Sequence, residues 1–399
     1  MRKLRDEQRG IIFIAIILAI LSSVVLFFTF ALKTDNVEEI IQKEKLVRLL
    51  LVVEEDEGNE LFSTVIIYDP ETKKGASFNV PSYTGATFKS LGRTDRLETV
   101  YNQKGMEVYK TEVENLLGIT IPFTTSIRMD DFIKLTDMLG GMRIFIFPAV
   151  DQVSPDGEER WLLPSGAVNL DGDKISTYLQ YRVESEDESD ILDRYQNVIT
   201  AFLTQLHDKS FVIFDGKNFD QYGKCLNSNL IDDDEKSLYR RLSEIDSESL
   251  IRQTITGSLR TVEGKTLLLP LNNGDFVKRA VKQTTSMIQA TEGNAAGHVY
   301  VLEIQNGTTI PKLASRTAKL YSSASYKVIS TINADSSDYR ETVILDHIGN
   351  ETAAKNVGDL IRCKNIREAT AEDDEKNPSK AQVDFTIILG SDFNGEVVY

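Results

Sequence analysis

An apolar run near the start of the chain constrains its fold more than any other feature. Residues 11 to 32 read IIFIAIILAILSSVVLFFTFAL and contain no charge. At about 1.5 Å of rise per residue, a helix of this length spans the roughly 30 Å hydrocarbon core of a bilayer. A cleaved signal peptide has a shorter apolar region of about 7 to 15 residues and a small-x-small cleavage site. The sequence therefore predicts an uncleaved transmembrane anchor over residues 11 to 32.

The charges on the two sides of this run predict its orientation. Residues 1 to 10 carry Arg2, Lys3, Arg5 and Arg9 against two acids, whereas the ten residues after the run hold one lysine and several acids. Basic flanks favour the cytoplasmic side, so residues 1 to 10 are predicted to be a cytoplasmic tail. No second apolar run returns the chain, which predicts a single-pass protein of the cytoplasmic membrane. Residues 33 to 46 then form a stalk, and the rest lies outside the cell membrane.

Composition excludes several classes of protein. The chain has 399 residues, 41% of them apolar, and a net charge of -16, so it can form two folded domains and would repel nucleic acid. Cys225 and Cys363 are too few for a disulfide framework or a thiolate zinc site. The sequence also lacks the His-Glu-x-x-His, Gly-x-Ser-x-Gly and Gly-x-x-x-x-Gly-Lys motifs of common hydrolases and nucleotide-binding proteins. No nucleic-acid partner and no metal ligand set are expected from these features.

Beyond the stalk, strand and helix patterns alternate, which predicts an α/β fold. Residues 46 to 53, LVRLLLVV, read as a buried strand, and residues 107 to 119 have apolar residues at helical spacing and a glycine stop. A mixed sheet flanked by helices is predicted over residues 47 to 288. The small polar stretch QATEGNAAG at 289 to 297 is the predicted linker. Residues 298 to 399 follow a β-α-β-β-α-β pattern, which predicts a small α+β domain.

The stretch QYRVESEDESDILDRYQN, residues 180 to 197, places two arginines around a run of acids between two predicted helices. One interpretation is an anion-binding site formed by Arg182 and Arg194. The alternatives are that Arg194 forms an ordinary i,i+4 pair with Asp190 and that Arg182 serves the C-terminal dipole of a helix. The acids from 184 to 190 are interpreted as a solvated loop, with metal binding as the other reading. Asp137, near a helix C-terminus, is expected to make a specific hydrogen bond.

The order of four motifs, VENLLGI, MDDFIKLTDMLGGMRIFI, LPSGAVNLDGDKISTYLQYR and SDILDRYQNVI, resembles the LytR-CpsA-Psr family of bacterial envelope proteins. The resemblance covers residues 47 to 288. The tail, with EIQNGTTIPKLA and VDFTIILGSDF, resembles the LytR C-terminal domain that is often appended to this family.

The resemblance implies a hydrophobic groove for a polyprenyl chain and an arginine-rich mouth for its pyrophosphate. Family enzymes move a glycopolymer from that lipid carrier to peptidoglycan or another acceptor with the help of magnesium. Such chemistry uses bidentate guanidinium groups for the pyrophosphate, carboxylates for the metal, and electrostatic stabilisation of the charge that develops during transfer. Magnesium is expected here only through this resemblance.

The sequence departs from the family at several site positions. The family's Ile-Pro-Arg-Asp turn reads NVPSYT at residues 79 to 84, and the Arg and Asp before its second strand fall on GNELFST, where Glu60 is the only acid. The first arginine of the Arg-x-Arg pair is Gln180. The residues predicted to border the pyrophosphate mouth are therefore Arg96, Arg182, Asp190 and Arg194.

Three functions remain open from the sequence. The first is a scaffold that binds a polyprenyl-linked or cell-wall glycan with impaired or absent catalysis. The second is an active phosphotransferase that uses a rearranged set of residues. The third is a structural role in which the C-terminal domain binds other envelope proteins.

Overall fold

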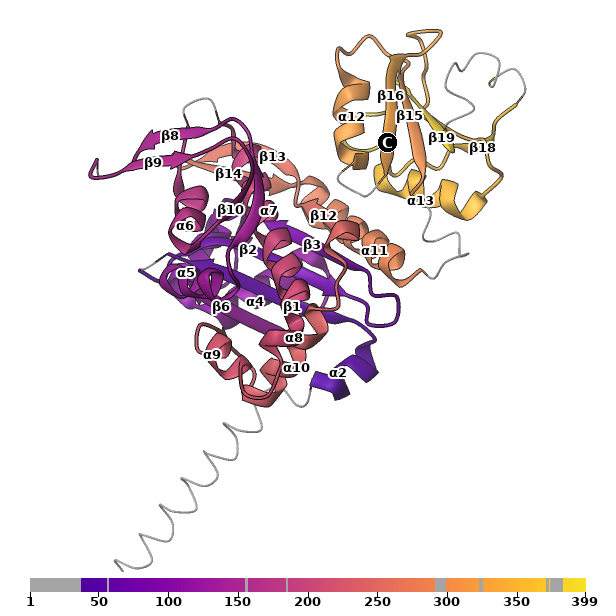
Figure 1. Cartoon of the computed structure of the whole chain (residues 1–399). Helices are drawn as coiled ribbons and strands as arrows, with labels where there is room; N and C mark the ends of the chain where they lie inside the picture. The colour runs from indigo at the N-terminus through magenta and orange to yellow at the C-terminus, as the bar shows by residue number, and fades with distance from the viewer. Residues whose placement is uncertain are drawn as a thin grey trace, which may run out of the picture.

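The computed structural model describes residues 37 to 399 apart from 56, 155–156, 184–185, 291–298, 323–325, 371–372 and 374–382 (Figure 1). The predicted cytoplasmic tail, the transmembrane anchor and the start of the stalk lie outside the described residues, as does most of the predicted linker. Among the helices that the structure describes, none is long and apolar enough to cross a membrane.

A six-stranded mixed sheet forms the centre of the larger domain, with the strand order β11-β6-β1-β2-β3-β12. Its central strands β1, β2 and β3 pair antiparallel, while β6 and β12 add parallel strands beside β1 and β3. The predicted strand at 46 to 53 is confirmed as β1. The strands are β1 (Val47–Glu54), β2 (Glu60–Tyr68), β3 (Gly75–Val80), β6 (Phe123–Arg128), β11 (Asn227–Ser228) and β12 (Ile251–Thr254).

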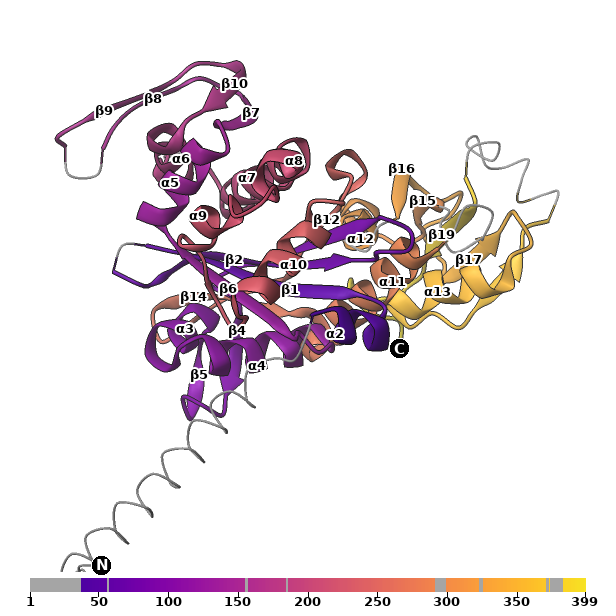
Figure 2. The ribbon, with the colours of Figure 1, turned by 60° about the horizontal axis from the view of Figure 1, so that its bottom comes forward.

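Helices cover both faces of this sheet because successive side chains of a strand point to opposite faces. Leu49 and Leu51 belong to one apolar core, and Leu50 and Val52 belong to another. Figure 2 shows the two helical layers on either side of the strands. The first face carries α5 (Met129–Met138), α6 (Gly172–Gln180), α7 (Glu188–Asp208), α8 (Ser210–Ile213), α9 (Phe219–Gly223) and α10 (Asp232–Leu242). The second carries α3 (Leu97–Lys104), α4 (Met106–Leu117) and α11 (Asp275–Gln289). The predicted mixed sheet flanked by helices is confirmed.

Glycines follow the ends of two of these helices, as predicted for the helix over residues 107 to 119. Helix α4 stops at Gly118, which has a φ of 71°, a conformation that costs glycine little. Helix α5 is followed by Gly140 and Gly141, with φ values of 82° and 92°. Strand β7 (Met142–Ile146) begins directly after them.

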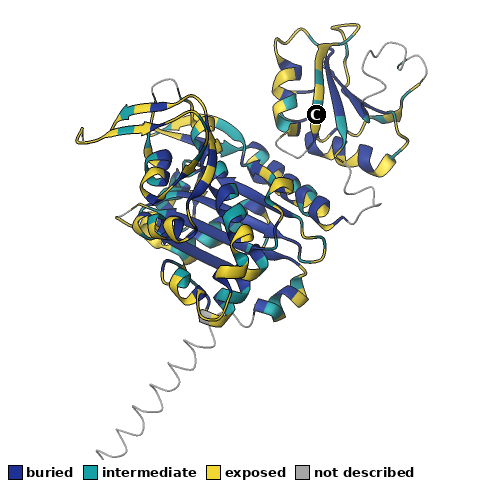
Figure 3. Ribbon diagram, in the orientation of Figure 1, coloured by how far each residue is buried: buried dark blue, intermediate teal, exposed yellow. Residues whose placement is uncertain are grey.

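Four two-stranded antiparallel sheets in the described chain extend the domain beyond its central sheet. The β8–β9 hairpin is largely exposed (Figure 3). Apart from β7, whose residues alternate between buried and exposed, these short strands have few buried positions and give little periodicity. The paired strands are β4 (Gly85–Phe88) with β5 (Arg93–Arg96), β7 with β10 (Gly166–Leu170), β8 (Val150–Val153) with β9 (Arg160–Leu163), and β13 (Gly257–Val262) with β14 (Lys265–Pro270).

The C-terminal domain contains a five-stranded sheet with the order β16-β15-β19-β17-β18. The pattern is β-α-β-β-α-β-β, so the prediction from the sequence lacked one strand. The extra strand, β18, has three residues and is mostly exposed, which explains why its sequence carries no strand pattern. The elements are β15 (Val301–Asn306), α12 (Leu313–Ser322), β16 (Lys327–Asn333), β17 (Val343–Asp346), α13 (Glu351–Ile361), β18 (Ile366–Glu368) and β19 (Phe385–Leu389).

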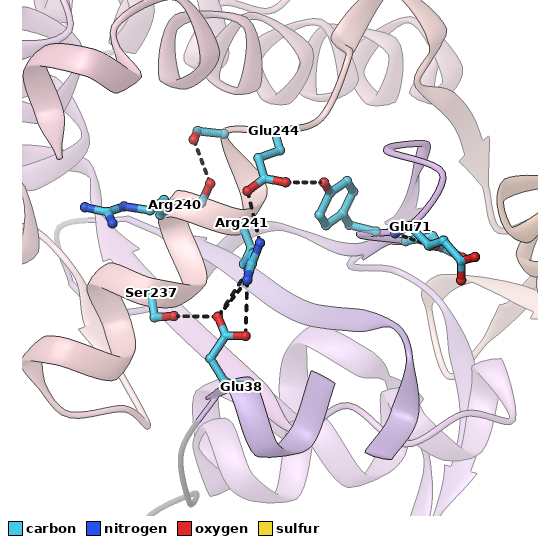
Figure 4. A network of polar contacts seen from close by, with 9 residues as sticks. Glu38, Glu71, Ser237, Arg240, Arg241 and Glu244 are labelled. Atoms are coloured by element: carbon cyan, nitrogen blue, oxygen red, sulfur yellow. Dashed lines mark hydrogen bonds and ion pairs between the residues drawn. The ribbon is translucent and has the colours of Figure 1, made fainter. Parts of the chain in front are cut away.

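Helix α2 (Val37–Glu44) joins the N-terminal end of the described chain to the larger domain. Val37 and Ile41 are buried in the core. The two Nη2 bonds from Arg241 on α10 to the Glu38 carboxylate are 3.0 and 3.1 Å long (Figure 4). Arg241 also bonds Glu244, whose carboxylate accepts a hydrogen bond from Tyr68 on β2. This polar network fixes α2 to the sheet.

Candidate functional site

The turn after β3, residues 81 to 84, connects the two sides of the candidate site. Just before it, Asn79 donates its side-chain amide to the Leu192 carbonyl of α7 at 3.0 Å. On its other side, the Ser82 and Thr84 carbonyls accept the backbone N–H groups of Glu98 and Leu97 at 3.0 and 2.8 Å. The β3 turn therefore lies between the first turns of α7 and the start of α3.

The acidic N-terminus of α7 also faces the β3 turn. The pKa of Tyr83 is raised to about 12, first by burial and then by the negative charges of Glu188 and Asp187. The direction of this shift indicates that acidic side chains at the start of α7 lie near the turn. An anionic ligand would be repelled by these carboxylates unless nearby cations compensate for their charge.

Arg182 lies two residues after the end of α6 and bonds carbonyl groups at the end of that helix. Its Nη1 donates to the carbonyl oxygens of Leu179 and Tyr181 at 2.9 and 2.8 Å. Its Nη2 donates to Tyr195 Oη at 3.0 Å, and the Tyr195 ring stacks on Phe62 of β2 with centroids 4.5 Å apart. The side chain thus satisfies helix C-terminal carbonyls, as the interpretation through the helix dipole expects, although the residue as a whole is exposed.

Arg194 is buried, with 4% of its surface exposed. Its Nη2 is 3.0 Å from Glu186 Oε2, and its guanidinium lies 3.7 Å from the centre of the Tyr181 ring. The predicted pair with Asp190 is wrong. Glu186 lies just before the helix and reaches the buried face on which Arg194 lies, whereas Asp190 has a different partner.

Asp187 and Asp190 form a capping box at the start of α7. The Asp187 carboxylate accepts the N–H groups of Ser189 and Asp190, and the Asp190 carboxylate accepts the N–H of Asp187 at 3.1 Å. Asp187, Glu188 and Asp190 are exposed, as a solvated segment predicts, but residues 188 to 190 belong to α7 rather than to a loop. The Glu186 side chain is only 9% exposed, and Glu184 lies outside the described residues. The carboxylates are needed for these bonds because the helix N-terminus must satisfy its free N–H groups.

Magnesium, which the resemblance implies, has no suitable ligand set at this position. In the described part of the chain, no three or more His, Cys, Asp or Glu side chains gather as they would around a metal ion. The carboxylates of Glu186, Asp187 and Asp190 already bond a guanidinium or backbone N–H groups. We therefore assign no step of the function to a metal ion.

Arg96 lies beside the β3 turn at the start of α3, where its backbone pairs with Gly85. Its Nε donates to the Thr266 carbonyl on β14 at 3.0 Å, and its Nη1 is 3.2 Å from Glu98 Oε1. Arg182, Asp190 and Arg194 gather at the junction of α6 and α7, on the other side of the turn. Each of the three arginines already bonds protein acceptors.

Glu60, at the position of the family's lost Arg and Asp, lies in a buried polar cluster. Tyr109 Oη donates to Glu60 Oε1 at 2.6 Å and is 2.6 Å from Ser63 Oγ. Glu60 Oε2 is buried without a hydrogen-bond partner, and burial is the main reason that the pKa of Glu60 is raised to about 7. The sequence singles out Glu60 but not Tyr109. The pattern that points to Glu60 is a single acid at the start of a mainly apolar strand.

An apolar cavity of about 470 Å³ begins where the β3 turn ends. Thr84 borders the cavity, and the β4 strand and helices α3 and α4 form much of its wall. Its apolar lining includes Phe88, Leu97, Leu116, Leu269 and Pro270. The site thus combines a polar turn, which lies near acidic side chains of α7, with an adjacent apolar cavity.

Comparison with known proteins identifies the larger domain. The model of the LytR_cpsA_psr family matches residues 64–282, more than half of the chain. The chain belongs to the LytR-CpsA-Psr family. A second model, described as LytR cell envelope-related transcriptional attenuator, matches residues 299–393 of the C-terminal domain.

Individual relatives of this LytR-CpsA-Psr protein are distant. It is 22% identical over 236 residues to the polyisoprenyl-teichoic acid–peptidoglycan teichoic acid transferase TagU of Bacillus licheniformis, with 58% of this chain and 75% of the relative covered. Against TagU of Bacillus subtilis the identity is 24% over 180 residues, covering 43% of this chain and 56% of the relative. The chain therefore spans little more than half the length of that second relative.

Solved structures share the fold. The crystal structure of Bacillus subtilis TagV has a TM-score of 0.53 and 18% identity, with 62% of this chain and 98% of that one covered. A structure described as TagT bound to LIIa-WTA has a TM-score of 0.51 and 14% identity, covering 62% and 92%. These similarities establish the sheet-and-helix architecture of the domain.

Proposed function

We propose that this LytR-CpsA-Psr protein binds a polyprenyl-phosphate-linked or cell-wall glycan at the outer face of the cytoplasmic membrane, as a scaffold with impaired or absent catalysis. Its family and the names of its relatives, which are teichoic acid transferases, support the ligand class. The buried Arg194–Glu186 ion pair is the observation that carries the loss of catalysis. The apolar run at residues 11 to 32 supports the membrane anchor.

Transfer of a glycopolymer from a pyrophosphate carrier requires cations that are free to stabilise the developing charge. Arg194 is neutralised by Glu186 and is removed from solvent. Arg182 uses both terminal nitrogens on protein oxygens, and the β3 turn offers Ser82 and Tyr83 in place of arginine and aspartate. The site is thus poor in available positive charge at the position where the reaction would need it.

The apolar cavity beside the β3 turn supports binding of an isoprenoid chain. Its wall of Phe88, Leu97 and Leu116 removes hydrocarbon from water, and Thr84 places the opening next to the polar turn. A lipid chain could occupy this space while its phosphate lies near Arg96. The exposed guanidinium of Arg182 could contribute to the same headgroup after exchanging a protein acceptor.

An active phosphotransferase is the second candidate, because Arg182 is exposed and Arg96 retains 31% of its side-chain exposure beside the turn. Both guanidiniums could rotate toward a bound pyrophosphate. A transfer rate that falls by at least about tenfold in Arg182→Ala, the usual loss of a charge-assisted contact, would favour this candidate. Unchanged transfer in that variant would remove its main residue.

Lipid extraction from the purified full-length protein, followed by mass spectrometry, tests the proposed ligand. We expect polyprenyl phosphate species to co-purify, and we expect Ala86→Trp to reduce them because Ala86 is exposed and lines the cavity. Ala167→Trp, an equal change at an exposed position of strand β10, is the matched control. Absence of polyprenyl lipid from every preparation would contradict the proposal.

A further inference from the structure

A second cavity, of about 470 Å³, lies between α11 and the C-terminal domain. Helix α11 contributes Arg279, Lys282 and Gln283, while the C-terminal domain contributes Tyr300 just before β15, Tyr326 just before β16, and residues of α13. The two domains are joined beside it, because Arg279 Nη2 donates to the Leu360 carbonyl at 3.3 Å and Arg362 is 3.4 Å from Asp275. Neither domain forms this cavity alone.

The lining of the cavity carries more positive than negative side chains. Arg279 Nε is buried without a hydrogen-bond partner, and within the described residues no carboxylate forms an ion pair with Arg279. Lys282 adds a second cation and Asp359 a single acid, so the lining is positive although the chain has a net charge of -16. A half-buried guanidinium whose Nε lacks a partner, although its Nη2 bonds the Leu360 carbonyl, is further stabilised when an anion binds to it.

The start of α13 favours an anion at a different part of the cavity from Arg279, which bonds the Leu360 carbonyl at the C-terminal end of the same helix. Its N-cap residue Asn350 and the first-turn residues Thr352 and Ala353 line the cavity. The N–H groups and dipole of a helix N-terminus attract negative charge. Arg279 and this helix end therefore favour negative charge at two separate parts of the cavity lining.

The remaining lining matches a sugar ring. Tyr300 and Tyr326 present aromatic surface, and Tyr300 Oη is 3.3 Å from the Asn350 side-chain amide. Gln283, Ser286 and Asn356 add groups that can both donate and accept hydrogen bonds, as sugar hydroxyl and acetamido groups do. Pockets of roughly 300 to 1,000 Å³ with aromatic walls and a few convergent polar groups are typical of small-molecule sites.

We propose that this interdomain cavity binds an anionic sugar unit, bearing either a phosphate or a carboxylate. This site is separate from the β3 turn and does not depend on the function proposed there. Its position gives the C-terminal domain a role in recognising glycan together with the LytR-CpsA-Psr domain.

Isothermal titration calorimetry on the full-length protein in detergent tests this site with four probes: N-acetylglucosamine 1-phosphate, N-acetylmuramic acid, neutral N-acetylglucosamine and inorganic phosphate. At least one anionic sugar should bind about tenfold or more tightly than the neutral sugar, as expected for a charge-assisted contact. Preference for the first probe indicates a phosphate-bearing glycopolymer, and preference for the second indicates a carboxylate-bearing wall glycan.

Variants of α11 assign the binding to the cavity. Arg279→Gln and Lys282→Gln should each weaken the preferred sugar by about tenfold, while Lys278→Gln, an exposed cation of the same helix outside the cavity, should leave it unchanged. Lys282 is exposed, so its variant does not threaten folding. Co-purified polyprenyl lipid should stay constant in all three variants, which separates this site from the one at the β3 turn. Failure of both anionic sugars to bind, equal weakening by Lys278→Gln, or equal affinity for inorganic phosphate would overturn the proposal.

Discussion

Glu186 and Arg194 form a buried ion pair at the junction of α6 and α7, with side chains only 9% and 5% exposed. The Tyr181 ring covers the guanidinium from one side at 3.7 Å. Because the pair is removed from water, neither charge is available to a ligand unless the junction opens. An arginine at a family position can therefore be retained for packing and charge balance alone.

Removal of Arg194 should strongly destabilise the larger domain. Arg194→Ala leaves the Glu186 carboxylate buried without its cation, which typically costs about 3 to 5 kcal/mol. Urea denaturation followed by circular dichroism measures the change. Lys134→Ala, which deletes an exposed ion pair with Asp131, is the control and should leave the midpoint unchanged. Equal midpoints for the two variants would contradict the structural role of Arg194.

Glu60 should make stability depend on pH. Its folded-state pKa is raised to about 7 by burial from an ordinary value of 4.5, so the protonated form is favoured in the folded protein. The wild type should therefore lose stability relative to Glu60→Gln as the pH rises from about 4.5 through 7, by about 3 kcal/mol at most. Unfolding curves of both proteins at pH 5 and pH 8 give the difference. A gap that does not grow between these pH values would show that Glu60 is ionised in the folded state throughout.

Asp137 should stabilise the start of α6 through one hydrogen bond. Its Oδ1 accepts the N–H of Gly172 at 2.8 Å, which confirms the specific bond expected from the sequence. Asp137→Ala should lower the free energy of unfolding by about 1 kcal/mol, whereas Asp137→Asn keeps an acceptor and should cost less. The two variants are compared by urea denaturation, and identical losses would mean that the negative charge is more important than the bond.

The Arg241–Glu38 contact should control the order of α2. Arg241→Ala removes three bonds to Glu38 and the bond to Glu244, so amide hydrogens of residues 37 to 44 should exchange faster with solvent. Lys236 lies on the same helix as Arg241 and makes an exposed bond to the Gly216 carbonyl. Lys236→Ala, which removes that bond, is the matched control. Hydrogen exchange followed by mass spectrometry measures both variants. Equal exchange rates of the α2 amides in Arg241→Ala and Lys236→Ala would contradict the role of Arg241 in holding α2.

The sequence predicts the parts of the fold in which local pattern and tertiary environment agree. The run LVRLLLVV becomes β1 because its side chains enter both apolar cores, and Gly118 ends α4 through its positive φ. The short strands β5, β8 and β18 escape prediction because few of their side chains are buried.

The sequence identifies several residues of the candidate site, but it does not identify the residues with which they form hydrogen bonds and ion pairs. Arg194 and Asp190 have the spacing of an ordinary helical pair, yet tertiary packing selects Glu186 instead. Glu60 and Tyr109 are 49 positions apart, and no local pattern connects them. Pairings of this kind depend on how α4 and the α6–α7 junction pack against the sheet, which periodicity does not specify.

The most direct test supplies the full-length protein with a polyprenyl pyrophosphate-linked glycan, peptidoglycan and magnesium, and measures bound lipid and transferred polymer in the same sample. We expect the lipid-linked glycan to be retained on the protein without transfer to peptidoglycan. Transfer that is abolished by Arg182→Ala in a protein that remains folded would contradict the account, because it would show that this site keeps enough positive charge for catalysis.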